Sequence, residues 1–220
     1  MPANGFEDFP YLTRQEFVQC ISGFMDKYAE AMAATGRYTV RIVNQNATTP
    51  GKRTFLEIQT LLYNKTQANP REQHSLSDLE QDQDIEDADP LHPPGPRPPP
   101  SIIGEVQYHV IYSPTWRVPT LYLRVTQGPS VITDMDGIRR LLIGDWEVRQ
   151  AVDAVEFGGA LGVQEHPELG VPFVFVHPCH TATMLRAVVQ GEVRVEWREY
   201  LAAWMSMVGG AVGLTLPTVK

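Results

Sequence analysis

The sequence predicts a single α+β domain over residues 1–220, with an N-terminal helix, a four-stranded antiparallel meander, a cysteine loop and C-terminal helices. Three observations support this. First, 220 residues of which 43% are hydrophobic are enough for one buried core. Second, apolar residues recur at helical spacing near both ends of the chain. Third, short alternating segments with short connections lie between them, as is typical of antiparallel strands.

The first predicted element is a helix that begins after Thr13. Thr13 and Glu16 form the Thr-x-x-Glu pattern of a capping box. Five apolar side chains then recur at helical spacing: Phe17, Ile21, Phe24, Tyr28 and Met32. Gly36 is placed to end this helix. Because Cys20 widens the same apolar stripe, we expect it to be a small buried core residue.

The next segments predict the strands of the meander. Two of them flank a turn that contains Pro50 and Gly51, which indicates a hairpin. Two more follow with a short connection, so they are expected to pair antiparallel as well. The four ranges are residues 38–44, 53–63, 105–113 and 120–127. Tyr108 and Tyr112 share one alternating face of the third strand, and we expect both in the core.

Residues 65–101 interrupt the meander without any apolar periodicity. Residues 71–100 carry eight acidic and two basic side chains, a balance of −6 that leaves only −2 of the net charge of −8 to the rest of the chain. Seven of the eleven residues 90–100 are proline. No face of such a segment buries enough apolar surface to offset the entropy lost on ordering. The sequence therefore predicts a disordered acidic and Pro-rich insertion within the domain.

The last third of the chain predicts short helices around one strand. The expected elements are a short helix capped within residues 133–136, a helix over 145–155, a buried strand over 171–176, and helices over 181–189 and 194–207. Residues 200–216 contain no charge, but three glycines interrupt them and they are short for a bilayer span of about 20 residues. We therefore expect a buried helix and turn there, with no stable membrane insertion.

The overall composition restricts the function classes. A net charge of −8 argues against a nucleic-acid partner, because few basic residues are present to neutralise phosphates. The N-terminal residues lack the basic-then-apolar pattern of a secretion signal, and two cysteines do not make a disulfide framework. These features favour the cytoplasm and reduced thiols. We expect neither a cofactor nor a bound metal.

Cys179 differs from Cys20 in its surroundings. It follows Pro178, which ends the predicted strand, and it precedes a helix that Thr181 is placed to cap. The amides and dipole at a helix N-terminus favour a thiolate at such a position. On these local features alone, a nucleophile and a structural thiol both stay open.

Two other interpretations of Cys179 are weaker. A thiol protease would need a base, for which His177 or His109 could serve, but no protease signature surrounds the cysteine. A zinc site could draw on nearby histidines and the thiol. Its ligands would be His166, His177, Cys179 and His180. Their spacing matches none of the regular Cys/His zinc patterns, so neither interpretation is favoured.

Three blocks of sequence resemble one known family. Residues 164–181, QEHPELGVPFVFVHPCHT, resemble the active-site region of the autophagy-related protein ten family of conjugating enzymes. Residues 108–124 resemble that family's central hairpin, and residues 204–217 are similar to its C-terminal segment. His-Pro-Cys alone is weak, since the related lipid-conjugating enzyme of autophagy carries it too. The three blocks in the same order make the resemblance specific.

The resemblance implies a ubiquitin-conjugating-enzyme-like fold and a cysteine-dependent transferase. Such an enzyme accepts a ubiquitin-like modifier, autophagy-related protein twelve, as a thioester on Cys179. The modifier comes from an activating enzyme, autophagy-related protein seven, and passes to a lysine of an acceptor, autophagy-related protein five. The alternatives are the lipid-conjugating relative and a catalytically silent adaptor of the same fold.

Two side chains are the predicted helpers of Cys179. His177 lies two residues upstream, so in an extended segment its side chain would share a face with that of Cys179; a catalytic and a structural role are both open. Trp116 occupies a hairpin position where relatives more often carry Tyr. An indole donates one hydrogen bond but cannot be a general base, so we expect Trp116 mainly to pack or shape the site. The His-Pro-Asn motif of ubiquitin-conjugating enzymes, whose Asn supports the oxyanion, has no counterpart shortly before Cys179.

Overall fold

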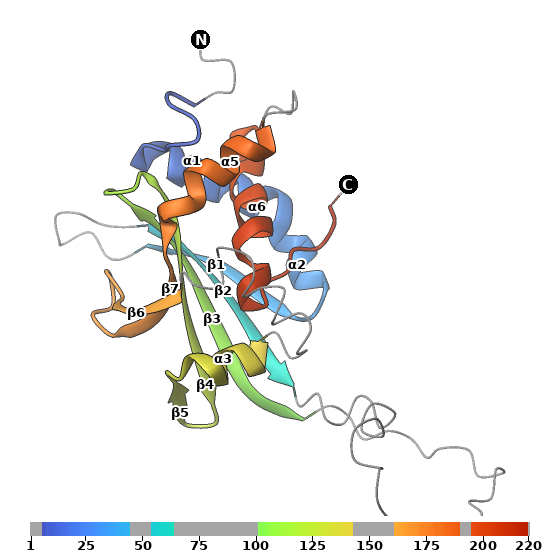
Figure 1. Ribbon diagram of the computed structural model, residues 1–220. Coiled ribbons are helices and arrows are strands. Elements are labelled where there is room, and N and C mark those ends of the chain that lie inside the picture. Colours follow the sequence, from blue (N-terminus) through green and yellow to red (C-terminus); the bar gives the residue numbers. More distant parts are fainter. Residues whose placement is uncertain (1–5, 45–53, 64–100, 143–160, 190–194, 220) are drawn as a thin grey trace, which may run out of the picture.

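The protein is described by a computed structural model that places residues 6–44, 54–63, 101–142, 161–189 and 195–219. In this part of the chain a layer of helices packs on one face of a single antiparallel sheet (Figure 1). The predicted α+β class is confirmed. The predicted insertion at 65–101 lies outside the described residues except for Ser101, and the predicted helix at 145–155 lies outside them entirely.

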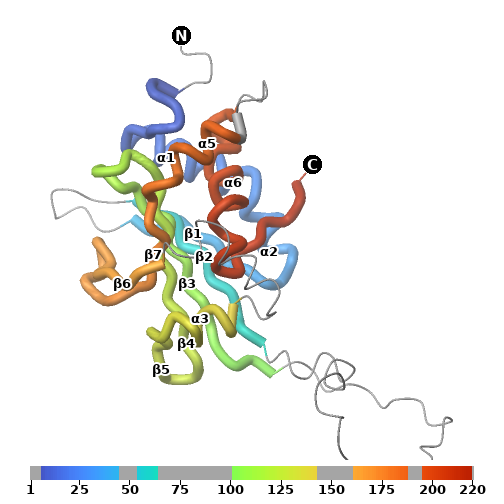
Figure 2. Tube along the Cα trace, viewed as in Figure 1, coloured from blue at the N-terminus to red at the C-terminus, as the bar shows by residue number. Residues whose placement is uncertain are grey.

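The helical elements lie near the two ends of the chain and after the fifth and seventh strands. The α-helices are α1 (Arg14–Phe24), α2 (Glu30–Ala34), α3 (Met135–Leu142), α5 (Thr181–Val189) and α6 (Trp197–Val208). A π-helical turn, Met25–Ala29, joins α1 to α2, and 3-10 turns cover Pro178–His180 and Gly210–Val212. The N-terminal helix was predicted as one regular helix, so the π-helical turn within it is a difference. In Figure 2 the C-terminal helices run beside α1, and α1 contacts α6 along its length.

The sheet extends the predicted meander by three strands. Its strands are β1 (Tyr38–Asn44), β2 (Thr54–Tyr63), β3 (Ile102–Ser113), β4 (Val118–Gln127), β5 (Ser130–Ile132), β6 (Leu161–Glu165) and β7 (Pro172–Val176). The order is β1-β2-β3-β4-β7-β6, with β5 paired to the end of β4. The four-stranded meander is confirmed, and β7 matches the strand expected over 171–176. Neither β5 nor β6 was predicted, because each is short and its pairing partner lies outside its own segment.

The capping box at the start of α1 is confirmed. The Glu16 N–H donates to Thr13 Oγ1 at 3.2 Å, and the Thr13 N–H donates to Glu16 Oε2 at 2.6 Å. The helical run ends at Gly36, whose φ of +67° is the left-handed conformation that glycine adopts without steric penalty. Cys20 is fully buried in this helix, as predicted.

One face of the sheet, here called the inner face, packs against the helices and makes the main core. Its largest fully buried members include Trp204, Tyr200, Tyr108, Phe17 and Phe24. The Tyr108 and Tyr112 side chains are buried as predicted. Their hydroxyls donate to the carbonyls of Val212 and Leu12, both at 2.8 Å, so each satisfies its polar end while its ring stays in the core.

The charge-free segment at residues 200–216 is part of this core. It forms most of α6 and the following 3-10 turn, and Tyr200, Leu201, Met205 and Val212 are among its buried residues. The prediction of a buried helix and turn is confirmed. Among the described residues, no helix is both long and apolar enough to cross a bilayer.

Candidate active site

Cys179 lies in the 3-10 turn Pro178–His180, where β7 ends and α5 begins. β7 pairs with β4 on one side and β6 on the other, and Leu185 of α5 is fully buried in the core. Pro178 is buried, whereas Cys179 is exposed. The fold therefore holds the backbone on both sides of the cysteine while leaving the thiol accessible.

His177 caps this turn with its side chain. Its Nδ1 accepts a hydrogen bond from the Cys179 N–H at 3.2 Å, and its backbone has the extended conformation of an N-cap residue. A neutral imidazole that accepts at Nδ1 carries its proton on Nε2, so one ring N–H remains free to donate. The expected extended geometry at 177–179 was wrong because the chain enters a helical turn. Thr181, expected as the cap, is instead the buried first residue of α5.

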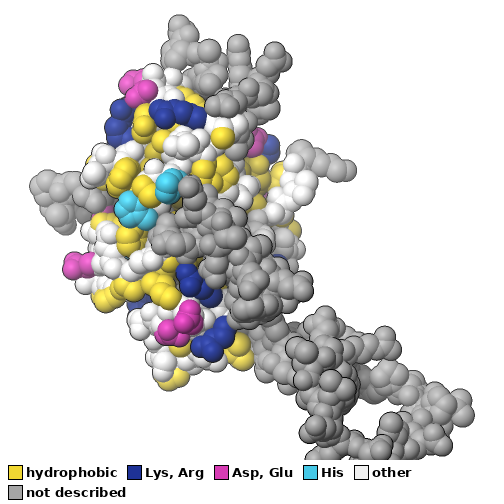
Figure 3. Space-filling view, in the orientation of Figure 1, with side chains coloured by type: hydrophobic (Ala, Val, Ile, Leu, Met, Phe, Trp, Pro, Cys, Tyr) yellow, Lys and Arg dark blue, Asp and Glu magenta, His cyan; other side chains and the backbone are white. Residues whose placement is uncertain are grey.

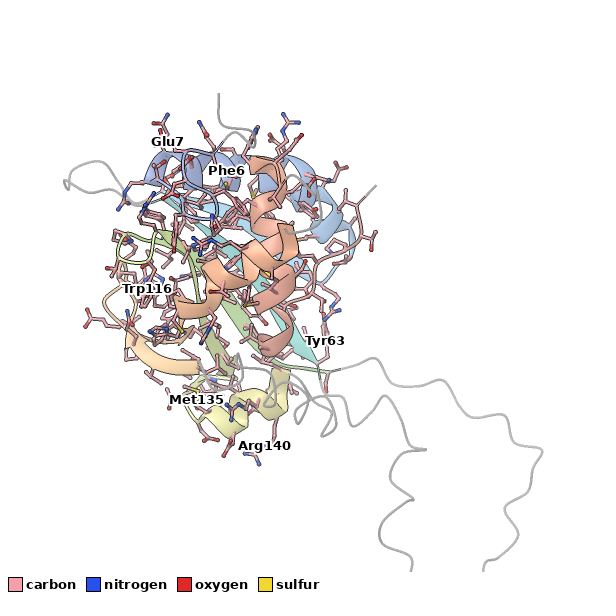
Figure 4. The ribbon with its side chains drawn as sticks, turned by 45° about the horizontal axis from the view of Figure 1, so that its top comes forward. Phe6, Glu7, Tyr63, Trp116, Met135 and Arg140 are labelled. Carbon is pink, nitrogen blue, oxygen red and sulfur yellow. The ribbon has the colours of Figure 1, made fainter. Side chains whose placement is uncertain are left out.

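Trp116 is brought to His177 by the turn between β3 and β4. The indole meets the imidazole edge to face, with ring centroids 5.3 Å apart and an interplanar angle of 76°. In Figure 4, Trp116 lies on the side of the molecule that carries the β6–β7 hairpin, far from Tyr63. The adjacent Arg117 has a φ of 55°, its carbonyl accepts from the Leu12 N–H at 2.7 Å, and its guanidinium pairs with Asp8 at 3.0 Å. The structure thus brings together Cys179, His177 and Trp116.

The two thiols are chemically distinct. Burial, and then the neighbouring Glu16 carboxylate, raise the pKa of Cys20 to about 12, so at neutral pH it remains a protonated core thiol. Cys179 lies at the protein surface. In Figure 3, histidine and hydrophobic side chains adjoin each other near the point where β7 meets α5 in Figure 1. Only one of the two sulfur atoms is therefore available to a macromolecular substrate.

The opposite, outer face of the sheet carries a second, smaller cluster beneath the cysteine turn. Its buried members are Phe55, Ile111, Tyr122 and Phe173, with Val43 and Phe175 packed against them. Gly162 makes room for Phe175, because a Cβ at this position would lie 2.9 Å from the Phe175 ring. The Phe175 ring in turn contacts His177, with centroids 6.0 Å apart. The outer-face cluster therefore supports the imidazole from below.

His109 and His166 belong to this outer face. Their rings share a hydrogen bond of 2.8 Å between His109 Nδ1 and His166 Nε2, and His166 Nδ1 accepts from the Glu168 and Leu169 N–H groups at 3.1 Å. The neutral tautomers therefore place the His166 proton on Nε2 and the His109 proton on Nε2 as well. His109 Nε2 lies 3.3 Å from Glu57 Oε2, within ion-pair distance but without hydrogen-bond geometry.

These partners give His109 and His166 structural positions. Burial, then the charge of Arg41, lowers the pKa of His109 to about 4. Burial, then His109, lowers the pKa of His166 to about 4. His109, considered above as a base, faces Glu57 and His166, and the His166 ring is occupied at both nitrogens. Among the described residues, no group of three His, Cys, Asp or Glu side chains is placed to hold a metal ion.

Sequence reasoning missed the residues that surround His177 on the outer face. Tyr122 and Phe175 lie directly opposite each other in the β4–β7 ladder, and Gln164 Nε2 donates to the Tyr122 hydroxyl at 3.1 Å. Strand alternation places Thr120 on the same face as Tyr122. The available signal was the alternation within residues 120–127, but the pairing of β4 with β7 was needed to use it.

The arrangement suits nucleophilic chemistry on a large substrate. Cys179 offers an exposed sulfur at the start of a helical segment, and the turn positions it between a capped backbone and a buried proline. The His177 imidazole, which caps the turn, is in ring contact with the Trp116 indole. A carbonyl carbon on the sulfur would therefore be open to a second nucleophile from solvent.

Comparisons with known proteins agree with this chemistry. The family described as "Autophagocytosis associated protein, active-site domain" matches residues 16–219. The chain is 34% identical over 127 residues to the ubiquitin-like-conjugating enzyme ATG10 of Homo sapiens, covering 53% of this chain and 52% of the relative. The proteins of the same name from Gibberella zeae and Arabidopsis thaliana are 32% and 27% identical, over 52% and 54% of this chain and 47% and 54% of each relative. The chain thus spans about half the length of the curated relatives it matches.

Proposed function

The chain belongs to the autophagocytosis-associated active-site domain family, and we propose that it is a conjugating enzyme for a ubiquitin-like protein. It carries the modifier as a thioester on Cys179 and transfers it to a lysine. The observation that carries the proposal is the exposed Cys179, held in a capped turn between β7 and α5 within the matched domain.

The chemistry requires little of the protein beyond position and charge stabilisation. A thioester is already activated, so the cysteine need not be part of a triad that cleaves an amide. Thioester exchange loads the sulfur, and a lysine amine then attacks the carbonyl carbon and releases the thiolate. The oxyanion formed on the way needs a donor. We assign this role to the Nε2–H of His177, with Trp116 packing the imidazole in place.

The proposed partners rest on the resemblance of residues 108–124, 164–181 and 204–217 to the conjugating-enzyme family, because the relatives' name specifies only a ubiquitin-like modifier. A ubiquitin-like-conjugating enzyme exchanges its modifier with an activating enzyme, and we propose autophagy-related proteins seven and twelve as activating enzyme and modifier, with autophagy-related protein five as acceptor. We place the reaction in the cytoplasm. A thioester carrier needs a reduced sulfur, and both cysteines of the chain are free thiols.

The direct test is adduct formation. Incubated with the activating enzyme, the modifier and ATP, the protein should gain one modifier in a band that reducing agent removes. The Cys20→Ala variant should form the same band, because Cys20 is buried and protonated. Adduct formation that depends on Cys20 would show that the other sulfur carries the modifier, and the absence of any adduct would refute the proposed function.

The role of His177 is tested by single-turnover discharge of preformed thioester. We expect His177→Ala to load normally and to discharge about a hundredfold to a thousandfold more slowly, because it removes the oxyanion donor. His177→Ser retains a side chain that can cap a helical turn but not the ring donor, and should be equally slow. His180→Ala removes the imidazole on the other side of Cys179 and serves as the control. Normal discharge by His177→Ala, or recovery of the wild-type rate in His177→Ser, would leave His177 a capping residue only.

A further inference from the structure

A groove of about 230 Å³ opens beside the cysteine turn on the outer face of the sheet. Its lining includes Trp116, Thr120, Tyr122, Gln164, Phe175 and His177, and among the described residues that line it none is Asp, Glu, Lys or Arg. One ordered water needs only about 10–15 Å³. The groove is therefore large enough for a side chain rather than a single water.

The sheet register places one end of the groove at the cysteine turn. Leu121 of β4 pairs with Val176 of β7. Because the two strands are antiparallel, Thr120, the residue before Leu121, lies level with His177, the residue after Val176. His177 and Pro178 both line the groove and immediately precede Cys179. The other end lies toward Gln164, which pairs with Phe173 two residues before Phe175 on β7.

The buried hydroxyl of Thr120 is a further indication that the groove binds a ligand. It is 4% exposed, and its hydroxyl has no hydrogen-bond partner within the described part of the chain. Burying a hydroxyl without a partner opposes folding, and native structures rarely do so without a reason. A hydroxyl beside a groove that ends at the catalytic turn is a position where a ligand group would supply the missing bond.

The walls of the groove fit the side chain of lysine. Trp116 and His177 meet at 5.3 Å, and Tyr122 stacks on Phe175 at 6.0 Å, so these four rings border the groove and can contact part of a lysine stem. Within the described part of the chain, no carboxylate lines the groove to hold an ammonium ion. Desolvation without a counter-charge favours the neutral amine, which is the form that attacks a thioester.

We propose that this groove binds the lysine side chain of the acceptor as its neutral amine, with the Thr120 hydroxyl as hydrogen-bond partner of the amine at the cysteine end and with Gln164 lining the outer end. This inference rests on the proposed function. The amine nitrogen attacks the thioester carbonyl carbon, the carbon–sulfur bond breaks, and the proton lost by nitrogen is taken up by the Cys179 thiolate. The products are an isopeptide bond and a free thiol.

The first test compares two nucleophiles on preloaded thioester. Nα-acetyl-lysine supplies one amine, and 2-mercaptoethanol supplies a small thiol that needs no lysine site. We expect Thr120→Val to lower discharge to the amine about tenfold and to leave discharge to the thiol unchanged, while Thr120→Ser retains both. Because Thr120→Val removes an unpartnered buried hydroxyl at nearly constant volume, its thermal midpoint should be equal to or above that of the wild type.

Three results would overturn the assignment. Wild-type discharge to the amine by Thr120→Val would exclude the hydroxyl, and an equal loss with amine and thiol would show that Thr120 only supports the turn. A wild-type chain that never forms a reducible thioester would overturn the proposed function and the groove with it. If the protein loads normally but Thr120→Val slows discharge to the amine and to the thiol equally, the proposed lysine site is overturned and the proposed function stands.

The second test adds charge to the groove. Gln164→Glu places a carboxylate there, which favours the ammonium form, so the pH of half-maximal discharge to Nα-acetyl-lysine should rise by about half to one unit. Gln164→Ala should leave this midpoint in place. The titratable groups that face the groove are Tyr122 and His177. Glu165 points to the opposite face of the sheet. Arg124 is on the same face as Tyr122, two residues further along β4, but it does not line the groove. An unchanged midpoint in Gln164→Glu would place the amine elsewhere.

Discussion

Replacing Cys179 with serine is expected to lower transfer of the modifier by at least about a thousandfold, while the fold is retained. The exposed side chain changes by one atom, so packing is unaffected. The chemistry changes because an alkoxide is a much poorer leaving group than a thiolate. Any adduct that forms on the substituted hydroxyl is an oxygen ester, which resists reducing agent and is cleaved by mild alkali.

The measurement is multiple-turnover conjugation followed by denaturing gels with and without reducing agent. Cys20→Ala is the matched control: it removes a sulfur that is fully buried, which should lower the free energy of unfolding by about 1 kcal/mol but leave conjugation intact. Wild-type conjugation by Cys179→Ser would mean that the reaction does not pass through this sulfur.

Acidification from pH 7 to about pH 4.5 should destabilise the protein through its buried histidine pair. His109 and His166 have folded pKa values of about 4, below the ordinary value of 6.5. Below pH 6.5 these histidines therefore bind protons in the unfolded chain but stay neutral in the folded chain. The free energy of unfolding falls as the pH drops from 6.5 toward 4. Above pH 6.5 this contribution is fully present.

The expected loss is a substantial part of a typical stability. A shift of about 2.5 units corresponds to roughly 3 kcal/mol for one imidazole, and because the two rings share a hydrogen bond the pair should lose roughly 3–6 kcal/mol by about pH 4. A small domain has only about 5–15 kcal/mol in total. The measurement is urea unfolding between about pH 7 and 4.5, a window chosen to lie above the ordinary carboxyl range.

His109→Gln provides the comparison for this effect. Glutamine can accept from His166 and face Glu57 as the imidazole does, but it does not titrate. The slope of unfolding free energy against pH should fall by about half in this variant. A wild-type slope near zero between about pH 6.5 and 4.5 would show that the two imidazoles are protonated in the folded chain.

Local sequence patterns were sufficient to predict those parts of the fold that depend on the residues of a single segment. The Thr13–Glu16 capping box, the end of the helical run at Gly36, the burial of Cys20 and the first four strands all follow from periodicity and cap chemistry. β5 and β6 were not predicted, because they are too short to show a pattern of their own. Their place is decided by hydrogen bonds to β4 and β7.

The active site, too, was predictable in part from the sequence and in part only from the fold. Sequence patterns alone distinguished the two sulfurs, since Cys20 lies on an apolar helical stripe and Cys179 follows a proline at the end of a strand. The spacing of two residues placed His177 near Cys179, and the family resemblance placed Trp116 there. What these residues contact depends on the three-dimensional fold. The capping bond from the Cys179 N–H to His177 requires a helical turn rather than an extended segment, and the ring contact with Trp116 requires the β3–β4 hairpin, which is distant in the chain.

The groove on the outer face belongs wholly to the tertiary structure. In the sequence, Thr120 and Gln164 look like ordinary polar strand residues. The groove forms because β7 lies between β4 and β6 and brings both into one groove that ends at the cysteine turn. The difference comes from the range of the interactions. Helix periodicity and caps act over a few neighbouring residues, whereas strand pairing joins positions at any separation, and its register settles which side chains share a face.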